Sequence, residues 1–180
     1  MSDPADRRPA TRAITSGRHE RSLAPPLWAS SVWESEGFDD ANRRATGHRS
    51  GEFYSRYGNP TVRAFEEAVA ELEGAESSLA FASGMGAVST VVLALCSSGD
   101  HIVAQRNLYS ATLSFLQGPC ARLGIDVTFV DASRPGAFAE AVRPGRTMLA
   151  LAETPSNPTL GIVDLDELGS LRGQIGRAHV

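Results

Sequence analysis

The 180-residue sequence contains no lysine, so all 17 of its basic residues are arginines. A chain without lysine has no side-chain amine that can form a Schiff base, which excludes one form of covalent catalysis. Cysteine is scarce as well. Cys96 and Cys120 stand in apolar, helix-like stretches and lack the close spacing of a metal or redox pair, so we interpret both as packing residues.

Several other classes of protein are disfavoured by what the sequence lacks. The four histidines share no metal-ligand spacing with one another or with a cysteine, so we expect no metal. The longest apolar run, Val88 to Cys96, is too short to cross a bilayer. The N-terminus lacks the apolar segment of a secretory signal, so we expect a cytoplasmic protein without a membrane partner.

The net charge of −4 gives the chain no general attraction to nucleic acid, and we expect no nucleic-acid partner. Arginines do cluster between Arg7 and Arg63, which we interpret as a solvated basic arm. An arm that binds nucleic acid is the weaker alternative. With 42% apolar and 21% charged residues, the composition is typical of one globular domain.

Patterns typical of helices and strands alternate along the chain after a polar stretch of about 50 residues. Asn59 is a predicted N-cap, Pro60 suits a first helical turn, and apolar residues recur at helical spacing until Gly74. A last helix is predicted to begin with a capping box at Asp164 and Glu167. Other helices are predicted over 84–96, 110–123 and 135–142, and strands over 101–105, 127–130 and 148–152.

This order of elements predicts an α/β fold with a mainly parallel sheet flanked by helices on both faces. Such sheets bind ligands beyond the carboxyl ends of their strands. Three segments that follow strands or loops are therefore candidates for a site, and they are expected to converge at one edge of the sheet. They are residues 83–86, 107–110 and 154–159.

Ser83, Gly84, Met85 and Gly86 form a turn that leads into a predicted helix. Two glycines let the backbone approach a ligand closely, and the first turn of a helix offers unpaired amide groups, so this turn can bind an anion such as phosphate. Glycines also serve close packing between a helix and a sheet. Both interpretations stay open.

The segment from Tyr54 to Thr61 holds an arginine whose planar guanidinium can grip a phosphate. Tyr54 can add its hydroxyl to the guanidinium donors of Arg56, because side chains two residues apart lie on the same side of an extended segment. The alternative is a surface arginine beside a helix cap.

Two further residues follow predicted strands. Tyr109 can stack its ring on a flat heteroaromatic group and relay a proton through its hydroxyl, or it can simply pack in a core or interface. Asn157 stands in a loop stiffened by Pro155 and Pro158, where it can donate to a ring oxygen or merely form a turn.

Taken together, these segments resemble the Cys/Met-metabolism, or transsulfuration, family of pyridoxal phosphate-dependent enzymes. That family includes cystathionine synthases and lyases, methionine γ-lyase and O-acylhomoserine sulfhydrylases. The resemblance runs from about Thr11 to Leu171. It implies pyridoxal 5′-phosphate as cofactor and the first part of an aminotransferase-like (fold type I) large domain over residues 51–173. Residues 1–50 would be an N-terminal arm that packs on a neighbouring subunit.

The resemblance also implies roles for residues within one subunit. The turn that begins at Ser83 would bind the cofactor phosphate through the backbone amides of Gly84 and Met85. Tyr109 would stack on the cofactor ring and could relay a proton, and Asn157 would lie near the ring's phenolic oxygen. Ser110 and Ala111 depart from the family, in which many members carry two glycines after this tyrosine and methionine γ-lyases a glycine and a cysteine. Because Ala111 is not a cysteine, the resemblance favours the other members over methionine γ-lyase.

Two residues are implied to act between subunits. In the family, the tyrosine and arginine that match Tyr54 and Arg56 reach across a dimer interface to the phosphate of the neighbouring subunit. The resemblance therefore implies a homo-oligomer, namely a tetramer built as a dimer of dimers.

The family's Schiff-base lysine, the aspartate that pairs with the ring nitrogen and the arginine for the substrate carboxylate all come later in its members. The chain is thus expected to be an N-terminal fragment of such an enzyme. Residues 174–180 abandon the family pattern and match a reading frame of a common sequencing-adapter DNA, so we expect this tail to be non-native.

For the complete protein, the resemblance implies elimination or replacement at the γ or β carbon of a sulfur-containing or O-acylated amino acid. The alternative that stays open is a non-catalytic protein that binds phosphate or pyridoxal phosphate, because the chain has no lysine.

Overall fold

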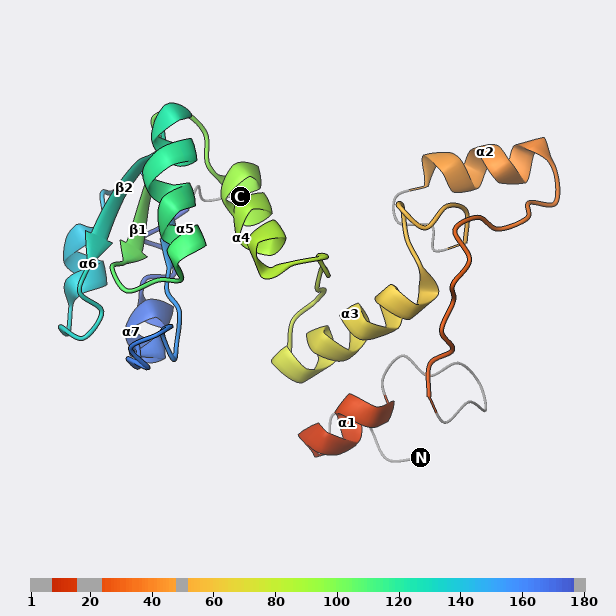
Figure 1. Ribbon diagram of the computed structural model, residues 1–180, viewed down its shortest axis with the longest axis horizontal. Coiled ribbons are helices and arrows are strands. Elements are labelled where there is room, and N and C mark those ends of the chain that lie inside the picture. Colours follow the sequence, from red (N-terminus) through yellow and green to blue (C-terminus); the bar gives the residue numbers. More distant parts are fainter. Residues whose placement is uncertain (1–7, 16–23, 48–51, 177–180) are drawn as a thin grey trace. The chain divides into compact units, whose positions relative to one another are not determined.

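A computed structural model describes residues 8–15, 24–47 and 52–176 (Figure 1). The chain forms two compact units, Met1–Ala80 and Phe81–Val180. The predicted arm, residues 1–50, falls within the first unit, and its parts 1–7, 16–23 and 48–50 lie outside the described residues, as do residues 177–180 of the predicted non-native tail. The proposed boundaries at residues 50 and 173 stay predictions.

The first unit contains the helix predicted after Asn59. Helix α3 runs from Pro60 to Glu73 with proline in its first turn, and the Asn59 side chain accepts a hydrogen bond from the Thr61 amide at 2.8 Å. It ends at Gly74, whose φ of 64° is a left-handed conformation that glycine adopts without strain. The cap signals in the sequence are therefore confirmed at both ends.

Two shorter helices of the first unit were not predicted. Helix α1, Pro9–Thr15, contacts α3, and its Arg12 donates a hydrogen bond to the Glu71 carbonyl at 2.8 Å. Helix α2, Phe38–Thr46, begins with two aspartates and ends with two arginines, which suits the helix dipole. Both helices are too short for an apolar period to be visible in the sequence.

The segment before α3 is tied to the start of that helix by three hydrogen bonds. The Trp28 amide donates to the Thr61 hydroxyl, which donates to the Pro26 carbonyl, each at 2.8 Å. The Asn59 side chain in turn donates to the Trp28 carbonyl at 2.9 Å. Leu27 lies between these anchors and is 88% exposed, so this apolar stretch is held by polar contacts.

The second unit is built on a three-stranded parallel sheet. Its strands are β1 (His101–Gln105), β2 (Asp126–Val130) and β3 (Thr147–Leu151), in the order β2-β1-β3. All three predicted strands are present within one residue of their predicted ends. The α/β fold class with a parallel sheet is confirmed.

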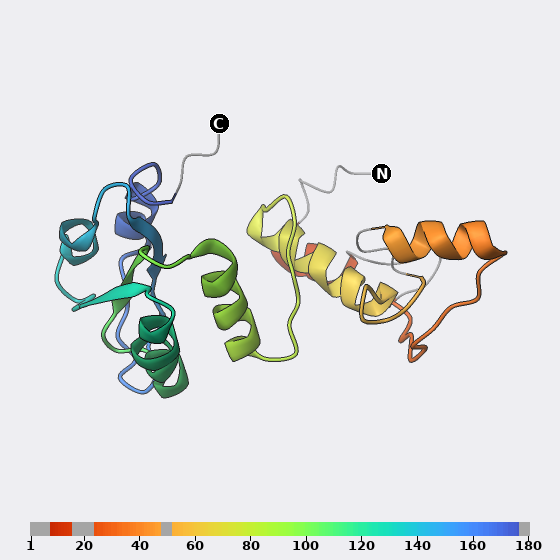
Figure 2. The same cartoon turned by 90° about the horizontal axis from the view of Figure 1, so that it is seen from above.

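Helices cover both faces of this sheet (Figures 1 and 2). Strand β1 is buried along its whole length, and its residues alternate between two cores. Ile102 and Ala104 pack with helix α4 (Gly84–Leu95) and the helical segment after Tyr109. Val103 packs in the other core, with helix α6 (Ala137–Ala141) and with residues next to helix α7 (Leu165–Ser170).

The helix predicted over 110–123 is interrupted. Helix α5, Ser110–Phe115, continues as a π-helical turn, η2, over Leu116–Cys120. Pro119 lies inside η2, and proline has no amide hydrogen and clashes with the carbonyl four residues before it. The wider π-helical turn accommodates this residue, so the prediction of one regular helix was wrong.

The capping box predicted at the last helix is only half formed. The Asp164 carboxylate accepts hydrogen bonds from the amides of Asp166 and Glu167 at 2.9 and 3.2 Å. Among the described residues, the Asp164 amide makes no hydrogen bond to the Glu167 carboxylate, one oxygen of which is buried without a partner there. The start of α7 is thus capped by Asp164 alone, without the reciprocal bond of a capping box.

Both cysteines are buried in the core cluster that covers one face of the sheet, as predicted. Burial raises the pKa of Cys96 to about 11, with further contributions from Asp100 and Cys120. A thiol with so high a pKa is a poor nucleophile near neutral pH.

In the described ranges, no helix combines the length and the apolar character that a membrane span requires. Nor do three or more histidine, cysteine, aspartate or glutamate side chains gather there in a group that could hold a metal ion.

A buried polar cluster joins the three strands at their amino ends. The His101 ring lies with one nitrogen 2.8 Å from the Thr147 hydroxyl and the other 2.8 Å from the Thr128 hydroxyl. The Arg143 side chain reaches the Thr128 hydroxyl at 3.3 Å and the Asp126 carboxylate at 3.1 Å. The polar side chains named here therefore hydrogen-bond to one another at this edge of the sheet.

We predict that His101 makes the stability of the chain depend on pH. Burial, aided by Arg143 and Arg146 and opposed by Asp126, lowers the pKa of His101 in the folded state. The unfolded chain then takes up a proton before the folded chain does, so the free energy of unfolding is highest above pH of about 6.5 and falls below it.

The variant His101→Gln keeps a donor and an acceptor but does not titrate. Urea unfolding between pH 7.5 and 5.5 should show a loss of stability in the parent chain and a flatter profile in this variant. Equal slopes in the two proteins would show that another group is responsible.

Candidate functional site

The candidate site of the second unit lies beyond the carboxyl ends of β1 and β3. Tyr109 follows β1 by four residues and serves as the N-cap residue of α5, with 47% of its surface exposed. Glu153 follows β3 by two residues, and Asn157 stands four residues further on in an exposed loop. Both segments therefore lie at the edge where parallel sheets bind ligands.

A single carboxylate joins Tyr109 and Asn157. One oxygen of Glu153 accepts a hydrogen bond from the Tyr109 amide at 2.9 Å, and the other accepts one from the Asn157 amide at 2.8 Å. The structure thus brings together two residues that lie 48 positions apart in the sequence. We call this pair of contacts the Glu153 bridge.

The last residue of β1, Gln105, fixes the backbone of Glu153. Gln105 is only 3% exposed, and its side-chain oxygen accepts a hydrogen bond from the Glu153 amide at 3.1 Å. Its side-chain nitrogen donates to the Asn107 carbonyl at 2.9 Å. Sequence reasoning assigned no role to Gln105 or Glu153, although a polar residue at the exit of each buried strand was a visible signal.

The turn before α4 forms as predicted, with Ser83 as N-cap. Its hydroxyl accepts a hydrogen bond from the Gly86 amide at 3.0 Å. Among the described residues, no group accepts a hydrogen bond from the amides of Gly84 and Met85. The two amides are the orphan donors that every helix start presents.

The two glycines of this turn serve different purposes. A side chain at Gly86 would place its first carbon 3.1 Å from the Ser83 hydroxyl, so Gly86 makes room for the cap. A side chain at Gly84 would meet nothing within 4 Å. Gly86 thus makes room for the cap within the turn, which differs from the helix–sheet packing considered in the sequence analysis, and Gly84 stands beside open space. Phosphate binding by this turn stays a prediction.

The turn is also connected to the segment that carries Tyr109. The Thr112 hydroxyl donates to the Met85 sulfur at 3.4 Å, and Thr112 lies in the first turn of α5, three residues after Tyr109. Ser83, Gly84, Met85, Tyr109 and Asn157 all belong to the second unit, and they are linked by this contact and the Glu153 bridge.

Tyr54 and Arg56 belong to the first unit. They do not lie on an extended segment as predicted, because the Tyr57 amide donates to the Tyr54 carbonyl at 2.9 Å and closes a turn. The expected proximity arises in another way. The Arg56 guanidinium lies 5.2 Å from the centre of the Tyr54 ring and 5.3 Å from that of Tyr57, within range of a cation–π interaction.

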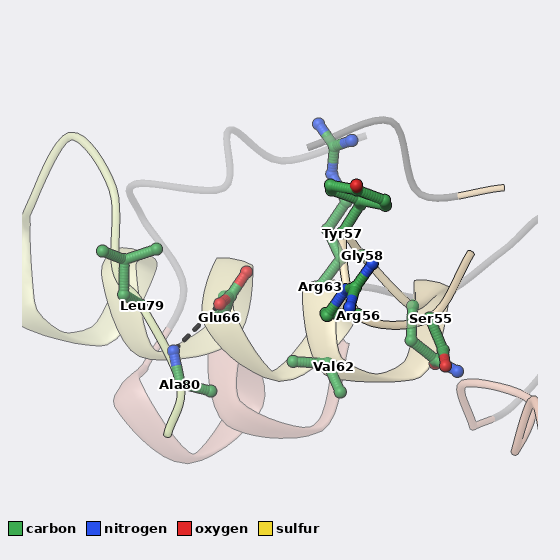
Figure 3. A pocket seen from close by; sticks show the side chains of 10 residues that line it. Ser55, Arg56, Tyr57, Gly58, Val62, Arg63, Glu66, Leu79 and Ala80 are labelled. Carbon is green, nitrogen blue, oxygen red and sulfur yellow. Dashed lines mark hydrogen bonds between the residues drawn. The ribbon is translucent and has the colours of Figure 1, made fainter. Parts of the chain in front are cut away.

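Arg56 also lines a pocket of about 320 Å³ in the first unit (Figure 3). In the part of the chain that the structure describes, no carboxylate forms an ion pair with Arg56, whereas Arg63 pairs with Glu67 at 3.1 Å. Glu66 turns its carboxylate to the Ala80 amide at 2.9 Å. The pocket is lined by Ser55, Arg56, Tyr57, Gly58, Asn59, Val62, Arg63, Glu66, Leu79 and Ala80.

Comparison with known proteins identifies the family. The sequence model of the Cys/Met metabolism PLP-dependent enzymes matches residues 10–178. The chain belongs to this family. The prediction made from the sequence motifs is thereby confirmed, and so is pyridoxal 5′-phosphate as the cofactor on which the family depends.

The relatives of the chain include enzymes of different reactions. It is 38% identical over 159 residues to L-methionine gamma-lyase of Porphyromonas gingivalis, and the aligned region covers 87% of this chain and 40% of the relative. It is 44% identical over 132 residues to O-succinylhomoserine sulfhydrylase of Pseudomonas aeruginosa, and the aligned region covers 73% of this chain and 32% of the relative.

A solved structure supports the fold of this family member. The crystal structure of MetB from Corynebacterium glutamicum resembles the chain with a TM-score of 0.81 at 31% sequence identity, over 97% of this chain and 44% of that one. The chain thus spans less than half the length of these relatives.

The residues of the second unit fit a pyridoxal phosphate. Two amides that have no acceptor in the described part of the chain stand at the start of a 12-residue helix, beside the open space at Gly84, and suit an anionic group. The exposed ring of Tyr109 offers a flat face in the same unit.

We predict that Ser83 fixes the shape of this turn. The variant Ser83→Ala loses the acceptor for the Gly86 amide, and loss of an N-cap lowers the free energy of unfolding by about 1 kcal/mol. Chemical denaturation measures this change.

Ser89→Ala is the matched control in the same helix. The Ser89 hydroxyl donates back to the Met85 carbonyl within α4 at 2.7 Å, and alanine is the better helix former, so this change should leave stability equal or slightly higher. Equal losses in both variants would contradict a capping role for Ser83.

Proposed function

We propose that this chain provides the phosphate- and ring-binding part of a pyridoxal phosphate site. The observation that carries the proposal is the arrangement of the second unit. Free amides at Gly84 and Met85 are connected through Thr112 to the segment of Tyr109, which shares the Glu153 bridge with Asn157.

In this proposal, the amides of Gly84 and Met85 donate to the phosphate, while Ser83 keeps the turn in shape. Two neutral amide donors and a helix-end charge effect of about 0.3–1 kcal/mol give only part of a tight phosphate site. The Tyr109 ring lies along the cofactor ring, and Asn157 lies near its phenolic oxygen. When bound, pyridoxal phosphate supplies an aldehyde that condenses with amines and a ring that accepts electron density from the substrate.

The remaining phosphate contacts are proposed to come from a neighbouring subunit. Arg56 suits this role because its guanidinium is positioned by Tyr54 and Tyr57 and has no carboxylate partner among the described residues. Exposed apolar side chains on α4, namely Val91, Leu93 and Leu95, support a covering subunit. We propose a homo-oligomer in which Tyr54 and Arg56 serve the neighbouring site, as a dimer of dimers with the N-terminal arm packed between subunits.

For the complete protein, we propose elimination or replacement at the γ carbon, or the β carbon, of a sulfur-containing or O-acylated amino acid. The names of the two relatives support the γ carbon, since methionine and O-succinylhomoserine both carry their leaving group there. We further propose the cytoplasm as the compartment in which this amino-acid metabolism takes place.

The 180-residue chain itself is proposed to bind without catalysis. It has no lysine, so covalent attachment of the cofactor to a side-chain amine is closed to it. This is the second candidate function, and it concerns the chain as it stands, whereas the enzymatic function concerns the complete protein.

We predict that Gly84→Ala weakens binding of pyridoxal 5′-phosphate by about tenfold, the equivalent of one lost charge-assisted hydrogen bond. The added methyl group enters the open space that the phosphate is proposed to fill. The fold should be unharmed, because alanine favours a helix over glycine by up to about 1 kcal/mol. Equilibrium dialysis against the cofactor measures the affinity.

Gly118→Ala is the matched control, since a side chain at this helical glycine of the same unit also meets nothing within 4 Å. Its affinity should stay within about twofold of the parent chain, because the position is remote from the proposed contacts. Tight binding that is unchanged by Gly84→Ala would overturn the assignment of the phosphate to this turn.

A further inference from the structure

The Glu153 bridge is more than a contact between two loops, because each oxygen of the carboxylate is used once. One oxygen accepts from Tyr109 and the other from Asn157, while the Glu153 amide is held by Gln105. The relative placement of the two loops is therefore set through one side chain that is anchored at the end of a buried strand.

We infer that Glu153, held by Gln105, is a positioning residue that sets Tyr109 and Asn157 against the cofactor. This inference rests on the proposed function and adds to it a residue that does not itself touch the cofactor. Glu153 acts through two backbone amides, so it fixes the backbone position of both residues and leaves their exposed side chains available to a ligand.

The chemistry of the bridge requires a carboxylate. A carboxylate presents acceptors on both oxygens and no donor, and its hydrogen bonds are roughly twice as strong as those between neutral groups. A glutamine of the same size would turn an NH₂ group toward one of the two amide donors. At least one arm of the bridge would then be lost.

The surroundings of the bridge distinguish it from a core contact. Tyr109 and Asn157 are exposed, and Glu153 belongs to neither of the two apolar clusters that cover the sheet. Among the described residues, no arginine forms an ion pair with Glu153. The contacts of this carboxylate are thus the two hydrogen bonds that order the loops at the site.

The test compares three variants of the chain. Glu153→Gln breaks the bridge. Glu140→Gln makes the same chemical change on α6, where the carboxylate pairs with Arg134 on the surface. Phe138→Leu removes volume from the core cluster on one face of the sheet and weakens the fold, and Phe138 lies on α6, away from the loop that carries Glu153.

Two measurements are made on each protein. Hydrogen exchange without ligand reports the protection of the Tyr109 and Asn157 amides. Circular dichroism with pyridoxine 5′-phosphate reports how firmly the ring is oriented, because this achiral ligand gains a signal only in a fixed asymmetric site. The probe lacks an aldehyde, so it does not react with the terminal amine.

We expect Glu153→Gln to speed exchange of at least one of the two amides about tenfold, and to lower the ligand signal at saturation at least twofold. Glu140→Gln and Phe138→Leu should leave the signal at saturation unchanged. An equal loss of signal in Phe138→Leu would show that Glu153 acts only on stability, which overturns the inference.

The two possible failures are distinguishable. If the parent chain binds the probe and Glu153→Gln binds it with the same signal, the inference fails and the proposed function stands. If the parent chain gains no signal at any probe concentration, the proposed function fails, and the inference fails with it.

Discussion

The candidate site depends on the carboxylate of Glu153, because this side chain holds together the two loops that leave neighbouring strands of the sheet. Strands β1 and β3 are neighbours in register, so their carboxyl ends lie at one edge. The chain that leaves each strand is free to diverge, and without a shared partner the loops at Tyr109 and Asn157 would be independent. Two charge-assisted hydrogen bonds to one side chain remove that freedom.

The two edges of the sheet illustrate opposite uses of polar groups. At the amino edge, the rings and hydroxyls of His101, Thr128 and Thr147 satisfy one another, and Arg143 pairs with Asp126. These contacts hold the strands together at that edge. At the carboxyl edge, the polar groups order the backbone but leave the amides at the start of α4 without an acceptor among the described residues. The donors without an acceptor among the described residues thus lie at the start of α4, and the amino edge uses its polar groups in contacts between strands.

Much of the second unit could be predicted from sequence because its signals are local. Runs of apolar and β-branched residues predicted all three strands, and in the first unit the Asn59 cap marked the start of α3. The parallel-sheet pattern predicted that the segments after β1 and β3 lie at one edge, where Glu153 connects them. What could not be predicted depends on contacts distant in sequence or on unusual backbone, such as the roles of Gln105 and Glu153, or the π-helical turn around Pro119. Short helices without an apolar period, α1 and α2, were missed for the same reason.

The most direct test of this account is to map the backbone amides of the chain by NMR during titration with pyridoxine 5′-phosphate. The account predicts that the largest shifts occur at Gly84 and Met85, with smaller ones at Tyr109 and Asn157, and that His101 and Thr128 at the opposite edge stay unchanged. Shifts concentrated at the amino edge, or a saturating ligand that leaves Gly84 and Met85 unmoved, would contradict it.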